Sequence, residues 1–274
     1  MAQTFAGVVL AAGAGTRLHP LTLLRPKALC PIGGVPLLDQ ALDRISPMAG
    51  TGPGHLAVNA HHRWEQIAAH VQDRAHLSRE DPVALGTAGA LGALRGWIAG
   101  RDVVLTNADA YLPGGLPGLG AGWEGRRCRL ACAPAGSSAA DFITPQGHGV
   151  RYVGACLLPW RLVRDLAATP SGLYEVLWRR AAERGELDLW PLPGTAVDCG
   201  TVADYLRANL HASGGVSVIG AGATIEGETT RSVVWDGAAV GPGEHLVDVV
   251  RAGDARHRVT VGRSPAGCLP ASPS

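Results

Sequence analysis

Hydrophobic and polar positions alternate in blocks along the first half of the chain. Three short runs are almost wholly hydrophobic and lie at residues 8–10, 56–59 and 103–106. A strand that is buried on both faces of a parallel sheet has this continuous pattern. Between the runs, apolar residues recur at helical spacing at 38–45, 64–71 and 91–98. Alternating strands and helices predict an α/β fold with a doubly wound, mostly parallel, Rossmann-like sheet.

We expect this sheet domain to cover residues 1–212. Further secondary-structure patterns lie at 129–133, 152–158, 173–184 and 202–212. Thr201 stands directly before the last of them, and a threonine there is a favourable start for a helix.

The pattern changes after residue 213. Aliphatic side chains then lie six residues apart, first at Ile219 and Ile225 and next at Val234, Val240 and Leu246. This spacing is typical of hexapeptide β-helix coils, and a three-residue slip between the two sets predicts a short, irregular β-helical module at 213–263. Residues 264–274 are rich in serine, proline and alanine, which predicts a disordered tail.

Composition and charge speak against several classes of protein. The 274 residues are 46% hydrophobic and carry a formal net charge of +1 without a run of like charges, so we expect binding to neither nucleic acid nor membrane. No apolar run approaches the roughly 18 residues needed to span a bilayer. The six cysteines form no C-x-x-C pair and are too sparse for a disulfide framework, which favours a cytoplasmic protein.

The segment from residue 8 to 31, VVLAAGAGTRLHPLTLLRPKALCP, carries the strongest chemical signal. Gly13 and Gly15 follow a buried strand, where a backbone without side chains can approach phosphates and point its amides at them. Arg17 and Lys27 add two cations, and Lys27 is the only lysine among 24 basic residues. Such a loop can bind a triphosphate and neutralise the charge that grows as pyrophosphate leaves.

Other glycine-rich motifs fit this segment less well. A dinucleotide fingerprint needs a third glycine where Leu18 stands, and the GK[ST] of a Walker loop is absent. Taken alone, G-x-G is more often an ordinary tight turn than a site. The TRL and PK that follow make the motif specific.

With these residues in place, the chain resembles the sugar-phosphate nucleotidyltransferase family, which includes mannose-1-phosphate guanylyltransferases and glucose-1-phosphate thymidylyltransferases. The likeness continues in PIGGVPLL at 31–38, VNAHH at 58–62, ALGTAGAL at 84–91, NAD at 107–109 and DCGT at 198–201. It implies an EC 2.7.7 type transferase that joins a nucleoside triphosphate to a sugar 1-phosphate, releasing pyrophosphate, in the synthesis of cell-wall or polysaccharide precursors.

The resemblance also implies roles for individual residues. Arg17 and Lys27 would be catalytic, with Lys27 near the α-phosphate. Asp109 and Asp198 would hold Mg²⁺. The expected nucleotide-binding residues are Ala11, Ala12, Gly13, Gly15, Thr16, Arg17, Gly86, Thr87, Ala88 and Asn107.

The two aspartates differ in how well an ordinary structural role would explain them. Asp109 closes a hydrophobic strand at the edge where α/β sheets bind ligands. Asp198 precedes Gly200 and Thr201, so it could equally be a turn or helix-cap residue.

The sugar site departs from the family pattern, because many members have a Glu-Lys-Pro segment between the two aspartates and this chain has no lysine there. By position alone, Arg151, Tyr152, Gly154 and Glu175 are candidates to hold the sugar phosphate.

The identity of the substrates stays open at this point. The ALGTAGAL segment and the C-terminal module favour GTP and mannose 1-phosphate, while uridylyl and thymidylyl transfer remain alternatives. A non-catalytic nucleotide-sugar-binding regulatory subunit is a second hypothesis, which the missing Glu-Lys-Pro favours and the presence of Arg17, Lys27, Asp109 and Asp198 opposes. We expect a homodimer formed through the C-terminal module.

Overall fold

The computed structural model describes residues 5–136, 139–254 and 256–262. The disordered tail expected at 264–274 lies outside the described residues. Within the described part, no helix is long and apolar enough to cross a membrane.

The chain divides into two compact units. Unit 1 comprises Met1–Ala14 and Leu37–Asp198, and unit 2 comprises Gly15–Pro36 and Cys199–Ser274. The domain boundaries expected at residues 212 and 263 stay predictions. The division passes through the glycine-rich loop, so each unit carries part of the expected site.

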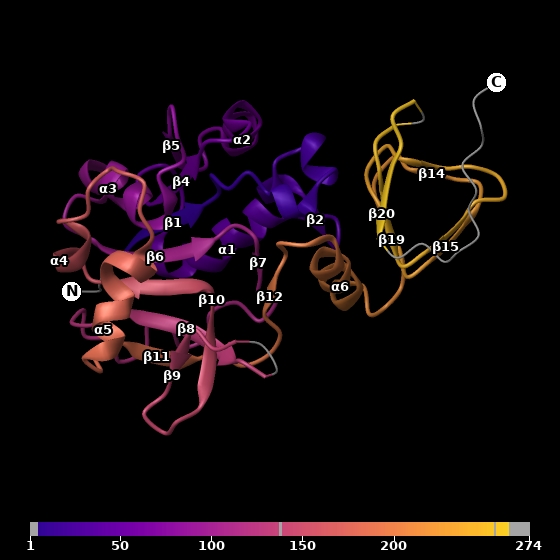
Figure 1. Cartoon of the computed structure of the whole chain (residues 1–274). Coiled ribbons are helices and arrows are strands. Elements are labelled where there is room, and N and C mark those ends of the chain that lie inside the picture. The colour runs from indigo at the N-terminus through magenta and orange to yellow at the C-terminus, as the bar shows by residue number, and fades with distance from the viewer. Residues whose placement is uncertain (1–4, 137–138, 255, 263–274) are drawn as a thin grey trace. The chain divides into compact units, whose positions relative to one another are not determined.

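Unit 1 is built on a central sheet whose main path has the strand order β11-β8-β10-β6-β1-β4-β5 (Figure 1). Neighbouring strands run parallel except β10, which is antiparallel to both β6 and β8. The strands on this path are β1 (Phe5–Leu10), β4 (Leu56–Ala60), β5 (His76–Arg79), β6 (Asp102–Asn107), β8 (Arg129–Pro134), β10 (Gly149–Leu158) and β11 (Asp188–Pro191). A short β9 (Phe142–Ile143) also pairs with β10. The prediction of a mostly parallel α/β sheet is confirmed.

The helices of unit 1 are α1 (Leu37–Ala49), α2 (Trp64–Val71), α3 (Gly86–Ile98), α4 (Trp160–Val163) and α5 (Arg179–Glu183), with a π-helical turn (Tyr174–Trp178) directly before α5. They include the three helices predicted from hydrophobic spacing.

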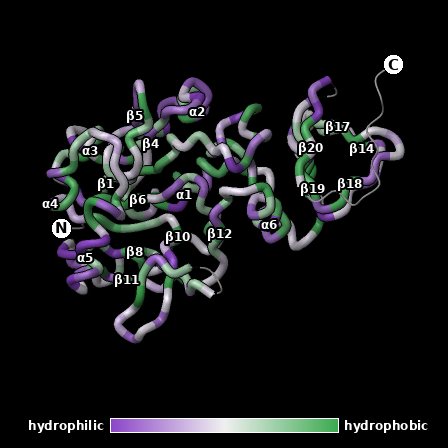
Figure 2. Tube along the Cα trace, viewed as in Figure 1, coloured by the Kyte–Doolittle hydropathy of each residue, from purple (hydrophilic) through white to green (hydrophobic). Residues whose placement is uncertain are grey.

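Helices cover both faces of this sheet, which explains why its central strands are continuously hydrophobic. Val8 of β1 belongs to the same buried cluster as Leu91 of α3. A Cβ added to the preceding residue, Gly7, would lie 3.1 Å from the Cδ1 atom of Ile45 in α1. Successive residues of a strand face opposite sides, so α1 and α3 pack on opposite faces. The tube in Figure 2 accordingly shows strongly hydrophobic segments in the central strands.

Unit 2 contains three short 3₁₀ turns, Thr16–Leu18, Leu21–Leu23 and Lys27–Leu29, a small hairpin of β2 (Pro31–Ile32) and β3 (Val35–Pro36), and α6 (Val202–Ala212). The Thr201 side chain accepts a hydrogen bond from the Asp204 amide at 3.2 Å. This is the helix start that the sequence predicted.

The C-terminal part of unit 2 is a small stack of β-helical coils. Parallel pairs join β13 (Val218–Ile219) to β16 (Val233–Val234), β14 (Thr224–Ile225) to β17 (Ala239–Val240), and β15 (Glu228–Thr230) to β18 (His245–Val247). β16 also pairs with β19 (Val249–Ala252), on which β20 (Val259–Gly262) lies antiparallel. Ile219 faces Val234 across the first pairing, whereas Glu228 faces His245, so the offset between coils is not constant. The predicted irregular β-helical module is confirmed.

The glycine-rich loop segment of unit 2 is fastened to α6 and to the β-helix through aromatic residues. The Tyr205 hydroxyl of α6 donates a hydrogen bond to the Pro31 carbonyl oxygen, and the Trp235 indole N–H donates to the Tyr205 oxygen at 3.0 Å. The Arg25 guanidinium lies 4.5 Å from the Trp235 ring centroid and forms an ion pair with Asp236 at 3.0 Å. The hydrogen bond from Arg25 lowers the pKa of Asp236. The chain just before Lys27 is thus held by the β-helix.

Candidate active site

The first half of the glycine-rich loop follows β1 in unit 1. Ala11 and Ala12 are buried, and Gly13 is exposed. A Cβ on Gly13 would have no heavy atom within 4 Å, so the packing of the protein itself does not require glycine there. The open space beside this backbone would admit a phosphate, and nucleotide binding at Gly13 stays a prediction.

We expect Gly13→Ala to leave stability within about 0.5 kcal/mol of the unchanged protein, because the added methyl group meets nothing. The same methyl group would stand where phosphate oxygens approach the amides, so the affinity for a nucleoside triphosphate should fall roughly 10- to 100-fold. Urea denaturation and calorimetric titration measure the two effects separately. Unchanged affinity would remove Gly13 from the nucleotide site.

A buried pair of polar side chains connects this loop to the start of α3. Asn59 accepts a hydrogen bond from the Ala11 amide at 2.7 Å and donates one to Glu80 at 2.7 Å. The other carboxylate oxygen of Glu80 accepts from the Leu85 amide at 2.7 Å. Both side chains are at most 3% exposed. Sequence reasoning missed this pair, although an asparagine at the end of a hydrophobic run was a signal for the first of them.

The expected nucleotide-binding residues Gly86, Thr87 and Ala88 lie at the start of α3, and this segment is hydrogen-bonded to the chain at Ser171 and Leu173. The Ala88 amide donates to the Ser171 carbonyl at 3.0 Å, and the Thr87 hydroxyl accepts from the Leu173 amide at 2.7 Å. A Cβ on Gly86 would lie 2.6 Å from the Ser171 oxygen. These contacts fix the segment in place, and its role in nucleotide binding stays a prediction.

The two candidate metal ligands belong to chain segments that pair just after the carboxyl end of β6. That strand ends at Asn107, and Asp109 lies in the turn that leads into β7 (Ala110–Tyr111). β12 (Val197–Asp198) pairs antiparallel with β7 and puts Asp198 opposite Ala110, the residue next to Asp109. Asp198 and the turn that carries Asp109, far apart in the sequence, are therefore brought onto adjacent segments of the chain, and metal binding by the two aspartates stays a prediction.

A bulge in β10 brings two of the sugar-site candidates to the same place. The register between β10 and β8 shifts between Tyr152 and Cys156, and Gly154 within the bulge has a φ of +84°. A Cβ there would lie 2.9 Å from the Ala110 Cβ, so only glycine allows this approach to the Asp109 turn. Bulges of this kind often re-aim side chains next to active sites.

Tyr152 packs its ring on Trp178, with the centroids 4.9 Å apart. Burial raises the pKa of Tyr152 well above the ordinary value, and the negative charge of Asp109 acts in the same direction. The phenol stays protonated at neutral pH, and its hydroxyl oxygen is buried.

The structure does not group all four sugar-site candidates. Arg151 is the strand neighbour of Tyr152, so their side chains leave β10 on opposite faces. Glu175 is exposed on the π-helical turn, three residues before Trp178. Tyr152 and Gly154 are the two that lie close to Asp109.

The second half of the glycine-rich loop belongs to unit 2. Gly15 has a φ of +65°, and a Cβ on it would lie 3.0 Å from the Lys27 Cβ. The Thr22 hydroxyl donates to the Gly15 carbonyl at 3.0 Å. A glycine and a lysine at opposite ends of this segment therefore touch. Thr16 and Arg17 are exposed in the following 3₁₀ turn, whereas Lys27 is 8% exposed.

A family model described as "MobA-like NTP transferase domain" matches residues 7–182, well over half of the chain. The protein belongs to this family. The part that matches the MobA-like NTP transferase domain contains the glycine-rich loop, Lys27, the 84–91 segment and Asp109, and it ends before Asp198. The family resemblance inferred from the sequence is confirmed.

Curated relatives of this MobA-like chain are named for three different nucleotidyl transfers. N-acetylmuramate alpha-1-phosphate uridylyltransferase of Caulobacter vibrioides is 30% identical over 132 residues, covering 44% of this chain and 53% of that protein. Two proteins of Mycobacterium tuberculosis follow. Mannose-1-phosphate guanylyltransferase is 32% identical over 109 residues, covering 37% of this chain and 29% of that protein. Glucose-1-phosphate thymidylyltransferase is 30% identical over 177 residues, covering 62% of this chain and 58% of that protein. The matched region spans less than two thirds of each relative.

Solved structures show the same fold at low identity. The Thermus thermophilus protein named mannose-1-phosphate geranyltransferase has a TM-score of 0.70 at 17% identity, over 95% of each chain. HddC from Yersinia pseudotuberculosis, in complex with GMP-PN, has a TM-score of 0.61 at 17% identity, over 76% of this chain and 99% of that one.

Sugar nucleotidyltransferases generally use a divalent cation, and binding of one by Asp109 and Asp198 stays a prediction. In the described ranges, no three or more His, Cys, Asp or Glu side chains are grouped to hold a metal. A cation held by two carboxylates would complete its coordination with phosphate oxygens and water, as Mg²⁺ commonly does at phosphate-transfer sites.

Proposed function

We propose that the protein is a sugar-1-phosphate nucleotidyltransferase, which joins a nucleoside triphosphate to a sugar 1-phosphate and releases pyrophosphate. The observation that carries the proposal is the pairing of β7 with β12. It puts Asp198 opposite Ala110, the residue after Asp109, close to the carboxyl end of β6. β6 in turn pairs with β1, the strand that leads into the glycine-rich loop.

The proposed reaction needs no strong base. An oxygen of the sugar phosphate, already anionic at neutral pH, attacks the α-phosphorus in line, and the bond to pyrophosphate breaks. The chain's task is to position two anions that repel each other and to stabilise the charge that moves to the leaving group. Backbone amides at Gly13 and Gly15 would bind the triphosphate, and Arg17 and Lys27 would neutralise it.

Asp109 and Asp198 would hold Mg²⁺. When bound, the ion would offset charge on the phosphates. The protonated Tyr152 and the tight backbone at Gly154 would border the sugar phosphate, because both lie close to the Asp109 turn.

For the substrates we propose GTP and mannose 1-phosphate. The ALGTAGAL segment and a guanylyltransferase among the relatives support this pair. Since nucleoside triphosphates are cytoplasmic metabolites, we expect the reaction to take place in the cytoplasm.

A pyrophosphate-release assay tests the proposal. It would cross GTP, UTP, dTTP, ATP and CTP with the 1-phosphates of mannose, glucose, N-acetylhexosamine and N-acetylmuramate, with Mg²⁺ present. Release with one pair would establish the reaction and its substrates. If no pair releases pyrophosphate and calorimetry shows that a nucleotide sugar binds, the regulatory-subunit hypothesis is favoured instead.

We also propose a homodimer through the C-terminal module. In the first coil Val216, Ile219 and Ile225 are 64%, 45% and 37% exposed, which is apolar surface that a second copy could bury. We expect sedimentation at micromolar concentration to give the mass of two chains. The Ile219→Asp variant should give a mass closer to that of a single chain. A monomeric profile for the unchanged protein would contradict the dimer.

A further inference from the structure

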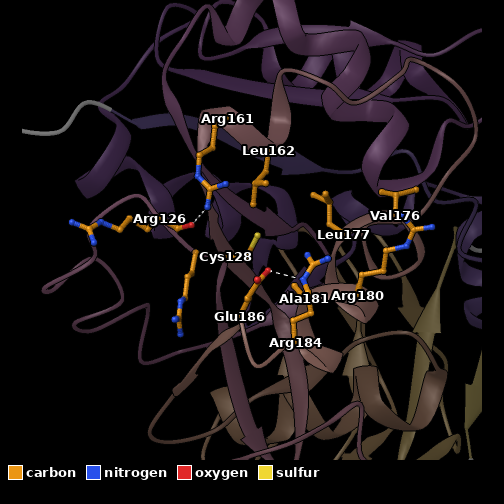
Figure 3. A pocket seen from close by; sticks show the side chains of 11 residues that line it. Arg126, Cys128, Arg161, Leu162, Val176, Leu177, Arg180, Ala181, Arg184 and Glu186 are labelled. Atoms are coloured by element: carbon orange, nitrogen blue, oxygen red, sulfur yellow. Dashed lines mark hydrogen bonds and ion pairs between the residues drawn. The ribbon is translucent and has the colours of Figure 1, made fainter.

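A pocket of about 500 Å³ in unit 1 has arginine as its most frequent lining residue (Figure 3). The five arginines are Arg126, Arg127, Arg161, Arg180 and Arg184. Among the described lining residues, Glu186 is the only acidic one. The whole protein has a net charge of only +1, so the local concentration of positive charge at this pocket is not evident from the net charge.

Few carboxylates neutralise these arginines. Arg184 pairs with Glu186 at 2.9 Å, and Arg126 pairs with Glu124 at 3.3 Å, both between exposed side chains. The other three have no carboxylate at ion-pair distance within the described residues. Two of them donate instead to neutral backbone oxygens, Arg161 to Arg126 and Arg127 to Gly185. Such bonds orient a guanidinium without removing its charge.

Apart from Glu186 and from Cys128, which lies directly before β8, the rest of the lining is apolar and comes from α4, the π-helical turn and α5. Leu162, Val176, Leu177 and Ala181 supply this wall, and Val176 is 40% exposed. Guanidinium groups bind phosphates with a planar fork and also stack on aromatic rings, while an apolar wall suits a base. The volume falls within the range of small-molecule sites.

The pocket lies near the amino end of β6, whereas the candidate active site lies at the carboxyl end of that strand. Asp102, at the amino end of β6, accepts a hydrogen bond at 2.7 Å from the Trp160 amide, and Arg161 comes next in α4. Asp109 follows the carboxyl end of the same strand. A six-residue strand spans ~20 Å, so the two sites are separate.

We propose that this arginine-lined pocket binds a nucleoside di- or triphosphate that regulates the enzyme. The binding part stands on the pocket alone, and the regulatory part rests on the proposed function. The π-helical turn connects the two sites: its Val176 and Leu177 line the pocket, and its Trp178 packs on Tyr152 near Asp109. A π-helical turn is a frequent feature of functional sites and can change its winding.

Calorimetric titration with ATP and with inorganic tripolyphosphate tests the binding part. EDTA suppresses metal-dependent binding at the aspartate pair. We expect R161S/R180S to weaken ATP binding roughly tenfold or more. The matched control R164S/R179S removes two exposed arginines next to them in sequence that do not line the pocket, and should stay within about twofold of the unchanged protein. ATP should bind more tightly than tripolyphosphate, because only ATP can use the apolar wall.

Equal weakening in both double variants would overturn the proposal, because general charge would then explain the binding. Equal affinity for ATP and tripolyphosphate would overturn the nucleoside part. If R161S/R180S does not fold, R161K/R180K keeps the charge without the fork and should still weaken ATP binding severalfold relative to the unchanged protein.

Activity distinguishes failure of the pocket from failure of the proposed function. With a working substrate pair, a nucleotide that is not turned over should change the rate of pyrophosphate release in the unchanged protein and in R164S/R179S, but not in R161S/R180S. The same response in all three would overturn the regulatory role. Absence of turnover with every pair would count against the proposed function, while the calorimetric result would still decide the pocket.

Discussion

Asp109→Asn is expected to lower kcat/KM for pyrophosphate release by roughly 10³-fold. The substitution keeps the shape of the side chain and removes the negative charge that would bind the metal, and metal-ion stabilisation of a phosphoryl-transfer transition state contributes several kcal/mol. Asp198→Asn should have a comparable effect, because the β7–β12 pairing places Asp198 opposite Ala110, the residue after Asp109. If both aspartates serve one ion, the double variant should be little worse than either single variant.

The matched control is Asp43→Asn, an exposed aspartate on α1. It should leave activity unchanged, and thermal unfolding of all variants would show whether the fold survives. The Mg²⁺ concentration for half-maximal rate should rise in the Asp109 and Asp198 variants. If Asp198→Asn keeps full activity and only loses stability, Asp198 is a turn residue before α6, which was the alternative left open by its sequence.

The sheet could be predicted from the sequence because its strands are buried on both faces. Residues at the centre of β1 alternate between α1 and α3, so every position had to be apolar and the run was easy to recognise. The hexapeptide spacing served equally well for the β-helix. Val234 and Val240 are both buried, Val234 on a strand that pairs with a coil on each side, and the period appears directly in the sequence.

The site was less predictable because its parts depend on long-range contacts. The sequence spacing of Gly15 and Lys27 did not predict their contact, because the contact depends on how the chain turns between them. The role of Glu80 depends on a hydrogen bond to Asn59, 21 positions earlier, and no local pattern announces such a pair. The same holds for Arg25 and Trp235, which are joined only because the β-helix lies against the loop within unit 2.

The arginine-lined pocket shows a different limit. Its arginines come from separate segments of the chain, and each is ordinary in its local sequence. A search for runs of like charge therefore found nothing, although the fold gathers five guanidinium groups around one volume. Net charge and charge runs describe the chain, whereas a ligand meets the charge at one place in the folded protein.

Lys27→Met is expected to lower kcat for pyrophosphate release by roughly 10²- to 10³-fold, with a smaller change in KM. Methionine keeps the aliphatic stem that packs beside Gly15 and removes only the ammonium group. A cation preorganised in a buried position acts most strongly on charge that develops as the bond to pyrophosphate breaks, so its loss falls mainly on kcat. Arg179→Met, which removes an exposed cation on α5, is the matched control and should leave the rate unchanged.

Lys27→Arg separates charge from shape. The side chain is 8% exposed and its Cβ is held against the glycine-rich loop, so a planar guanidinium has little room there even though the charge is kept. We therefore expect Lys27→Arg to recover only a small part of the lost kcat, and full recovery would show that any cation suffices. Because Lys27 is the only lysine, reductive labelling with pyridoxal 5′-phosphate and peptide mapping report on it in the unchanged protein. A nucleoside triphosphate with Mg²⁺ should protect it, and labelling that is indifferent to nucleotide would place Lys27 outside the site.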